Sequence, residues 1–161
     1  MTIILRIFLV LTLASAAGHS LAGQNEIEKI LALDKAPPGV VFEVVSGKDA
    51  LTWAIPEVKR QSERLRARFP GLSIALVSHG SEQFALTKAN RERYAAVHSG
   101  VREIRQSGID VQVCGTHASW RNLDREDFPD YVEVVAAGPV TISNYREIGY
   151  HLVVLRQPAA P

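Results

Sequence analysis

Cysteine is nearly absent from this sequence, and this limits the kinds of disulfide and metal site that the chain can form. The single cysteine, Cys114, stands in the stretch IDVQVCGTHASW. One thiol excludes an internal disulfide. Its Cys-x-x-His pair with His117 is a weak signal for a metal site, because metal sites that are specific in sequence show two such pairs. Cys114 is therefore expected to be buried, to bind a metal, to pair with another molecule or to be employed chemically.

An excess of charge of one sign is also missing. Lysine and arginine number 18 and aspartate and glutamate 17, so the formal net charge is +1. A nucleic-acid-binding protein normally has a strong basic excess, and we therefore expect no nucleic-acid partner. The sequence also lacks a glycine-rich phosphate loop, a nucleophile elbow and a metalloprotease helix.

Long apolar runs are missing everywhere except near the N-terminus. Residues 7–13 are apolar, Arg6 is the only lysine or arginine before them, and small residues follow. This pattern predicts a signal peptide over residues 1–22, with cleavage after Ala22 as first choice and after Ala16 as second. A membrane-spanning helix needs about 20 apolar residues. We therefore expect no stable membrane insertion and a soluble, periplasmic mature protein.

The rest of the chain alternates between strand and helix patterns. Removal of 22 of the 161 residues leaves 139, enough for one domain. We expect strands at 40–47, 72–80, 109–115, 131–138 and 150–155. Apolar stripes predict helices between them, with Pro56 as the first helical position of one helix. This order predicts an α/β fold, a three-layer α/β/α domain with a five-stranded, mainly parallel sheet.

The predicted domain covers residues 40–156. A polar lead-in segment over residues 23–39 precedes it, and a disordered tail over residues 157–161 follows it. No repeat or internal linker divides the domain. His98 falls within a predicted helix and His151 within a predicted strand, so both are expected to be structural.

Two polar side chains end consecutive predicted strands. His79 closes ALVSHG and Cys114 closes VQVCG, and a glycine follows each. Because ligands bind beyond the carboxyl ends of parallel strands, these residues predict a site there. His117, Trp120 and Arg121 follow Cys114 in the next loop and are the expected binding residues.

The role of Cys114 stays open between two interpretations. An unpaired cysteine usually packs as a small apolar residue. Ile109, Val111 and Val113 share one face of the strand, however, so Cys114 falls on the other, more polar face. That placement favours a working thiol, and His79 at a neighbouring strand end would favour its thiolate form. A third interpretation takes Cys114, His117 and His79 as ligands of zinc or copper.

The motifs together resemble a known family. The stretches VSHGSEQFAL, IDVQVCG and LDREDFPDYVEVVAAGPVTISNYREIGYHLVVL are similar to the DsrE/DsrF-like family of sulfur-relay proteins. Its members have a strand that closes in His-Gly, a strand that ends in cysteine, an Asp-rich turn, and a helix that ends in a Gly-Tyr step. The resemblance covers about residues 40–155. It implies a small α/β domain that assembles into trimers or hexamers, and a cysteine at the position of Cys114 that carries sulfur as a persulfide. His79 matches the His-Gly step.

The leading hypothesis is a periplasmic sulfur-handling protein, similar to a sulfurtransferase, that carries sulfane sulfur on Cys114. It would accept sulfur from a small donor and pass it to a protein acceptor, and this exchange requires no metal or organic cofactor. One alternative is a non-catalytic oligomeric binding module with a cleft at the strand ends, and another is a metal-binding periplasmic protein. We also expect a homotrimer or homohexamer, partly from the resemblance and partly because Trp120, Phe128 and Tyr131 crowd one end of a small domain. Such a group of aromatic residues marks either an interface or the lining of the cleft.

Overall fold

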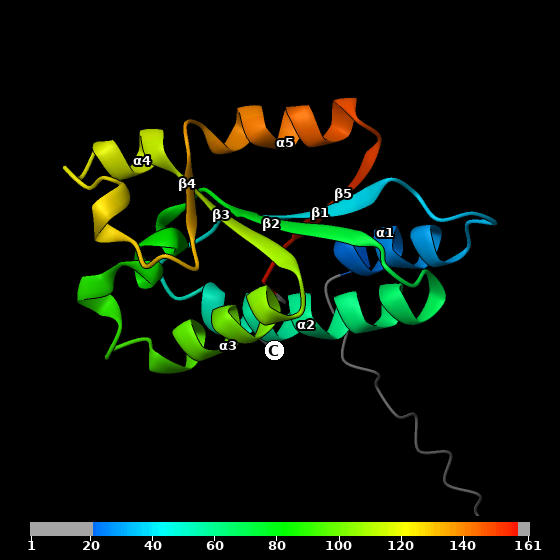
Figure 1. The fold of residues 1–161 in the computed structure, drawn as a ribbon, viewed down its shortest axis with the longest axis horizontal. Helices are drawn as coiled ribbons and strands as arrows, with labels where there is room; N and C mark the ends of the chain where they lie inside the picture. The colour runs from blue at the N-terminus through cyan, green and yellow to red at the C-terminus, as the bar shows by residue number, and fades with distance from the viewer. Residues whose placement is uncertain (1–20, 158–161) are drawn as a thin grey trace, which may run out of the picture.

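A five-stranded parallel sheet forms the centre of the protein. The computed structural model describes residues 21–157 (Figure 1). The strands run in the order β4-β3-β2-β1-β5, and each neighbouring pair is parallel. The predicted α/β fold, with helices on both sides of a five-stranded sheet, is confirmed. The strands are β1 (Gly39–Val44), β2 (Ser73–Ser78), β3 (Ile109–Cys114), β4 (Glu133–Val135) and β5 (Tyr150–Leu155).

The helices cover the two faces of the sheet unequally. Three of them, α1 (Leu21–Leu31), α2 (Leu51–Arg68) and α3 (Ala95–Gln106), lie on one face, and α5 (Gly138–Glu147) lies on the other (Figure 1). The connection from β4 through α5 to β5 brings the chain back across β3, β2 and β1. One short helix, α4 (Gly115–Ser119), follows β3. The 3-10 helices are η1 (Ser81–Leu86), η2 (Lys88–Asn90) and η3 (Arg125–Asp127).

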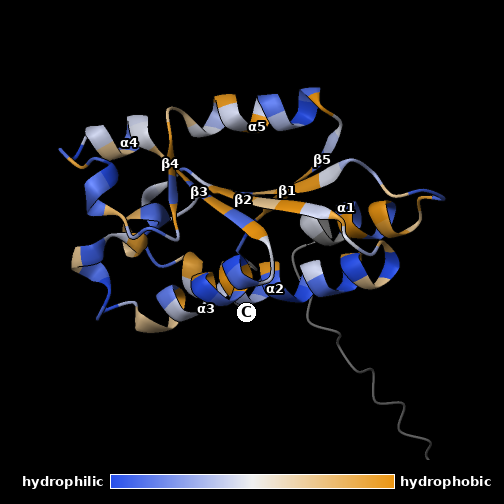
Figure 2. Cartoon of the chain, in the orientation of Figure 1, coloured by the Kyte–Doolittle hydropathy of each residue, from blue (hydrophilic) through white to orange (hydrophobic). Residues whose placement is uncertain are grey.

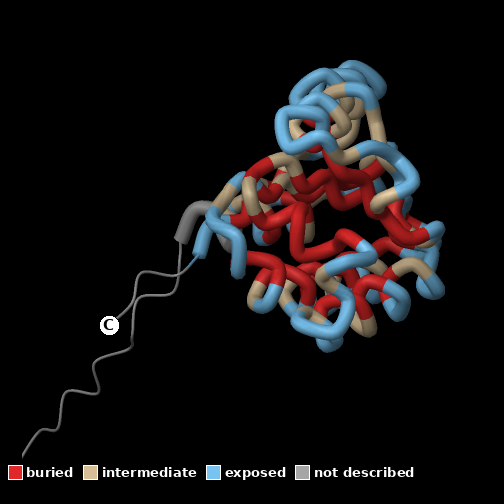
Figure 3. Tube along the Cα trace, turned by 90° about the vertical axis from the view of Figure 1, so that its left-hand side faces the viewer, coloured by how far each residue is buried: buried red, intermediate tan, exposed pale blue. Residues whose placement is uncertain are grey.

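Strand alternation divides the core into two parts. Side chains such as Phe42 and Leu76 point toward α1, α2 and α3, and they belong to the larger cluster of buried residues. Val41, Ala75 and Val77 point the other way and pack with Ile142 of α5 in a small cluster. Figures 2 and 3 show the apolar and buried residues concentrated in the sheet between the helix layers. The central strands are covered on both sides, as near-continuous apolar runs predict.

The start of α2 differs from the prediction. Pro56 lies inside this helix, which begins at Leu51 rather than at Pro56. A proline this near the start removes the hydrogen bond that its N–H would have made within the helix. Burial of Leu51, Ala54 and Ile55 in the core offsets that loss, because all three are at most 3% exposed. Core packing therefore outweighs the local proline signal.

The predicted lead-in segment contains a helix that packs on the sheet. Ile27 and Ile30 of α1 are each 1% exposed, and α1 contacts β5 and α2. Two buried apolar side chains among many polar ones form too short an apolar stripe to predict a helix from the sequence. None of the helices within residues 21–157 combines the length and apolar character needed to span a bilayer. The predicted signal peptide lies almost wholly outside the described residues, as do residues 158–161 of the tail.

Candidate functional site

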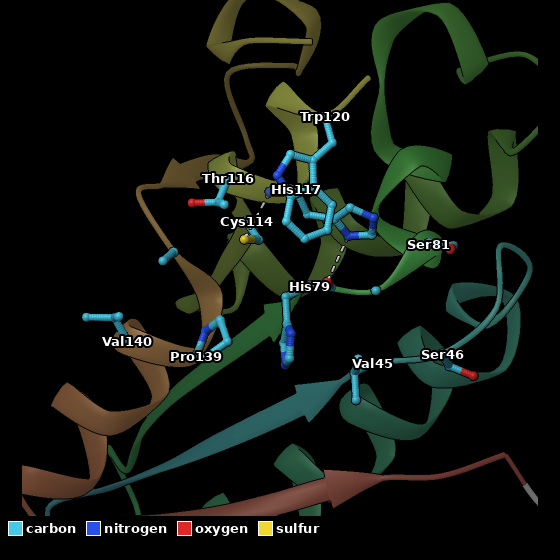
Figure 4. Close-up of a pocket in the computed structure, with 12 residues that line it drawn as sticks. Val45, Ser46, His79, Ser81, Cys114, Thr116, His117, Trp120, Pro139 and Val140 are labelled. Atoms are coloured by element: carbon cyan, nitrogen blue, oxygen red, sulfur yellow. Dashed lines mark hydrogen bonds between the residues drawn. The ribbon is translucent and has the colours of Figure 1, made fainter. Parts of the chain in front are cut away.

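A cavity opens at the carboxyl ends of the strands, where the sequence predicts a site. Its volume is about 630 Å³, within the range of about 300–1,000 Å³ that is usual for small-molecule sites. Four segments form its wall: the loop after β1, the end of β2, the β3–α4 corner and the start of α5 (Figure 4). The lining residues are Val45, Ser46, His79, Gly80, Ser81, Cys114, Thr116, His117, Trp120, Ala137, Pro139 and Val140.

Cys114 lies at the wall of this cavity and is largely covered. It is the last residue of β3 and is 4% exposed. It belongs to neither cluster of buried apolar residues. The backbone N–H of His117 donates a hydrogen bond to its Sγ over 3.4 Å, across the first turn of α4. The thiol is therefore a polar partner at the strand end rather than part of the main core.

A buried glutamine holds the backbone of Cys114. The Cys114 N–H donates to Oε1 of Gln83 over 2.8 Å, and Nε2 of Gln83 donates to the Cys114 carbonyl over 3.3 Å. Gln83 is 0% exposed, so these bonds replace the water that its amide gives up on burial. Sequence reasoning missed this residue, because a glutamine in a polar-looking stretch gives no sign of burial.

A neighbouring buried glutamate ties the ends of β1 and β2 together. Glu82 is 0% exposed. Its carboxylate accepts hydrogen bonds from the Ser46 N–H at 2.8 Å, the Gly80 N–H at 2.8 Å and the Ser78 hydroxyl at 2.9 Å. A buried carboxylate is tolerated only with such partners. Glu82, also missed from the sequence, therefore fixes the loops on both sides of the cavity.

His79 is paired with a carboxylate on the next strand. Its Nε2 lies 2.8 Å from Oε1 of Glu43 in β1, and both side chains are mostly buried. A carboxylate in its ionised form only accepts hydrogen bonds, and it would then take this one from Nε2. Glu43 interrupts the apolar run of β1, but its partner follows only from the strand order, which the sequence did not predict.

His117 is oriented by the end of β2. Its Nδ1 donates to the carbonyl of His79 over 3.0 Å. Its ring packs between two aromatic rings, edge-on to Phe84 at 5.0 Å and tilted to Trp120 at 5.2 Å between centroids. The predicted residues His79, Cys114 and His117 are thus brought together, from two strands and the helix that follows them.

Gly138 makes the close approach of α5 to the site possible. A Cβ atom added there would lie 2.6 Å from Cβ of His79 and 3.4 Å from Cβ of Cys114. His79 and Cys114 therefore both contact the same point of the α5 backbone. Only glycine leaves enough room, and no local pattern distinguishes this glycine from the others among the 11 in the chain.

The two other predicted binding residues have different positions. Trp120 lines the cavity and is 74% exposed. The guanidinium of Arg121 lies 4.0 Å from the centroid of the Phe84 ring, and Arg121 does not line the cavity. The expected surface group of Trp120, Phe128 and Tyr131 is not formed, because Phe128 is 2% exposed and belongs to the core.

The predicted metal ligands do not form a metal site. Within residues 21–157, no group of three histidine, cysteine, aspartate or glutamate side chains is placed to hold a metal ion. Nδ1 of His117 and Nε2 of His79 are already committed to hydrogen bonds with the His79 carbonyl and Glu43. The geometry of the described residues therefore does not favour the interpretation of the site as a metal centre.

Comparison with known proteins supports the resemblance at the level of fold. No family model matches the chain, and no curated protein matches it in sequence. A protein of unknown function, MTH1491 from Methanobacterium thermoautotrophicum, superposes with a TM-score of 0.58 at 20% identity, covering 72% of this chain and 97% of that one. The ychN protein from E. coli gives 0.51 at 13% identity, covering 73% and 98%. Both have the DsrE-like fold, and this chain shares that fold.

Proposed function

We propose that this protein carries sulfane sulfur as a persulfide on Cys114. The observation that supports this most directly is the position of the thiol at the wall of a cavity, beside two imidazoles and at the carboxyl end of its strand. The shared DsrE-like fold is consistent with the proposal. No cofactor is needed, because sulfur exchange requires only a thiolate, access and a leaving group.

The chemistry follows from the groups at the cavity. The Cys114 thiol loses its proton, and its sulfur attacks the sulfane sulfur of a donor. A new bond to Sγ forms while the sulfur–sulfur bond of the donor breaks, and the donor leaves as a thiolate. The imidazoles of His79 and His117 are the groups lining the cavity that are best suited to move that proton. With no second cysteine in the chain, the persulfide persists until an outside acceptor removes it.

Mass spectrometry of the folded protein tests this function. Polysulfide is expected to add at least one sulfur atom to native Cys114, and Cys114→Ser is expected to abolish the addition without loss of fold. His79→Ala is expected to slow the addition. If sulfur adds to Cys114 only after denaturation, the thiol is a structural residue and the proposal is wrong.

A binding module without catalysis is the second candidate function. Cys114 is only 4% exposed, and exposed apolar side chains surround the cavity mouth. In that case the cavity would hold a ligand while the thiol stays unreactive. Alkylation of the native protein distinguishes the two functions, because a working thiol reacts with a small alkylating agent and a structural thiol does not.

Export and assembly belong to the same proposal. Export to the periplasm rests on the apolar N-terminal segment, and N-terminal sequencing of protein from intact cells tests it. We expect a homotrimer or homohexamer for two reasons. One is the family resemblance, and the other is that α5 is the helix that covers one face of the sheet, with the exposed side chain of Ile148 just after it. Light scattering that detects only a monomer at micromolar concentration would contradict the assembly.

A further inference from the structure

The cavity beside Cys114 has an apolar mouth. Four large apolar residues in residues 21–157 are strongly exposed: Val45, Trp120, Val140 and Ile148. The first three line the cavity, and they come from three different segments of the chain. In Figure 4, Val45 and Val140 lie on opposite sides of the cavity and Trp120 lies across from both. Exposed apolar side chains that gather around a cavity mark a binding surface for an apolar ligand.

The same cavity has no cationic side chain in its lining to bind an anion. Its lining contains no lysine, arginine, aspartate or glutamate. The charged groups that contact the lining residues from behind are carboxylates, Glu43 on His79 and Glu82 on Ser46 and Gly80. Arg121, the cation among the predicted binding residues, stacks on Phe84 and does not line the cavity. Cationic side chains such as arginine form the strongest contacts with oxyanions, and none of them lines this cavity.

The size of the cavity also argues against an inorganic donor. A volume of about 630 Å³ is far larger than a thiosulfate or short polysulfide ion, which would leave most of the apolar wall in contact with water. An organic molecule of ring size or above would cover Val45, Trp120 and Val140 and bury that surface. Because Cys114 is only 4% exposed at the cavity wall, the reactive sulfur of such a donor has to project from a narrow end of the molecule.

We propose that this cavity selects organic hydropersulfides, R–S–SH, in which R is apolar and uncharged, over inorganic sulfur anions. The inference rests on the proposed function and names its donor. The step is balanced: Cys114–SH and R–S–SH give Cys114–S–SH and R–SH. A bond forms between Sγ of Cys114 and the terminal sulfur of the donor, while the sulfur–sulfur bond of the donor breaks. The leaving R–S⁻ takes the proton that Cys114 gave up, and no oxidant is needed.

Two matched donors and two matched variants test the selection. Benzyl hydropersulfide and 4-carboxybenzyl hydropersulfide have the same ring and differ by one charge. Loading of Cys114 is followed by mass spectrometry, with inorganic polysulfide as a third donor. We expect benzyl hydropersulfide to load at least about tenfold faster than the carboxylate, since one misplaced charge at an apolar wall typically lowers affinity by that much or more.

The variants locate the selection at the cavity mouth. Val140→Asn makes the mouth polar without adding a charge that would repel polysulfide, and it is expected to slow loading by the benzyl donor by about tenfold and so to reduce its advantage over polysulfide. Ile148→Asn is the control, because Ile148 is also strongly exposed but does not line the cavity; it is expected to leave the ratio of the two rates unchanged. Both positions are on the surface, so both variants are expected to fold.

The outcomes separate this inference from the proposed function. Equal loading by both benzyl donors, or faster loading by polysulfide, overturns the selection and leaves sulfur transfer intact. The same holds if only a persulfide on a cysteine-containing peptide loads Cys114, which would point to a protein donor. If no donor modifies native Cys114 while each modifies the denatured chain, the proposed function and the selection both fail.

Discussion

Replacement of Gly138 by alanine tests the geometry on which the whole site depends. The added Cβ would lie 2.6 Å from Cβ of His79 and 3.0 Å from its Cγ. Contacts below 3.0 Å require atoms to move, and Cβ of His79 cannot turn away because it is fixed to the backbone. That backbone is held in turn, since the His79 N–H donates to the Val44 carbonyl and its own carbonyl accepts from His117. The start of α5 must therefore shift outward.

The magnitude follows from two opposing effects. Overpacking of this kind typically costs about 1–3 kcal/mol of unfolding free energy. Replacing glycine by alanine at the start of a helix returns up to about 1 kcal/mol, through lower backbone entropy in the unfolded chain. The difference spans about 0–3 kcal/mol. Because the closest contact is with a Cβ fixed to the backbone, we expect a net destabilisation near the middle of that range, about 1–2 kcal/mol, or a fall in Tm of roughly 2–8 °C for a protein of this size. Displacement of His79 and Cys114 is also expected to slow sulfur loading of Cys114.

Gly47→Ala is the matched control, because it lies in the loop after β1 and no atom lies within 4 Å of its added Cβ. Its stability is expected to be unchanged or to rise by up to about 1 kcal/mol. Urea unfolding and thermal melts measure both variants, and mass spectrometry measures loading. If Gly138→Ala matches Gly47→Ala in stability and in loading rate, α5 does not pack on His79 and Cys114 as described.

Three further predictions concern buried polar groups. Glu82→Gln is expected to lower the unfolding free energy by about 2–4 kcal/mol, because its NH₂ would face N–H donors; exposed Glu63→Gln is the control in urea unfolding. Gln83→Ala leaves the N–H and carbonyl of Cys114 without a side-chain partner, so amide exchange at Cys114 is expected to speed up. Burial lowers the pKa of His98 below 6.5, so the unfolded chain takes up the proton first as pH falls. Stability is then expected to decline below pH 6.5, and less so in His98→Gln, as urea midpoints at several pH values would show.

The sequence predicted the parts of the structure that depend on periodic burial. Apolar runs such as that of β2 mark strands covered on both faces, and glycines bound them, so the five strands and their parallel arrangement followed. The meeting of His79 and Cys114 also followed, because each ends a strand and parallel strands end at one edge. Their close approach also depends on β2 and β3 being neighbours in the sheet, which the sequence did not predict.

The parts that escaped prediction depend on contacts between distant residues. Glu82 and Gln83 are polar side chains that are buried only because backbone groups of other segments satisfy them. Gly138 matters because α5 crosses above β2 and β3, which the strand order decides. Phe128 was expected on the surface and lies in the core, since aromatic residues near a polar turn carry no signal of which way they point. Local patterns do not contain this information.

The surroundings of Cys114 bear on whether its thiol is a packing residue. On β3, Val111 and Val113 are fully buried and point into the main core between the sheet and α1, α2 and α3. Cys114 lies on the opposite face and lines a cavity. Gln83 holds its backbone by two hydrogen bonds, more than van der Waals packing of a thiol requires. Buried side-chain amides such as that of Gln83 hold residues whose position must be well defined. These contacts favour a working thiol over a filler, and the rate of alkylation of native Cys114 would decide between them.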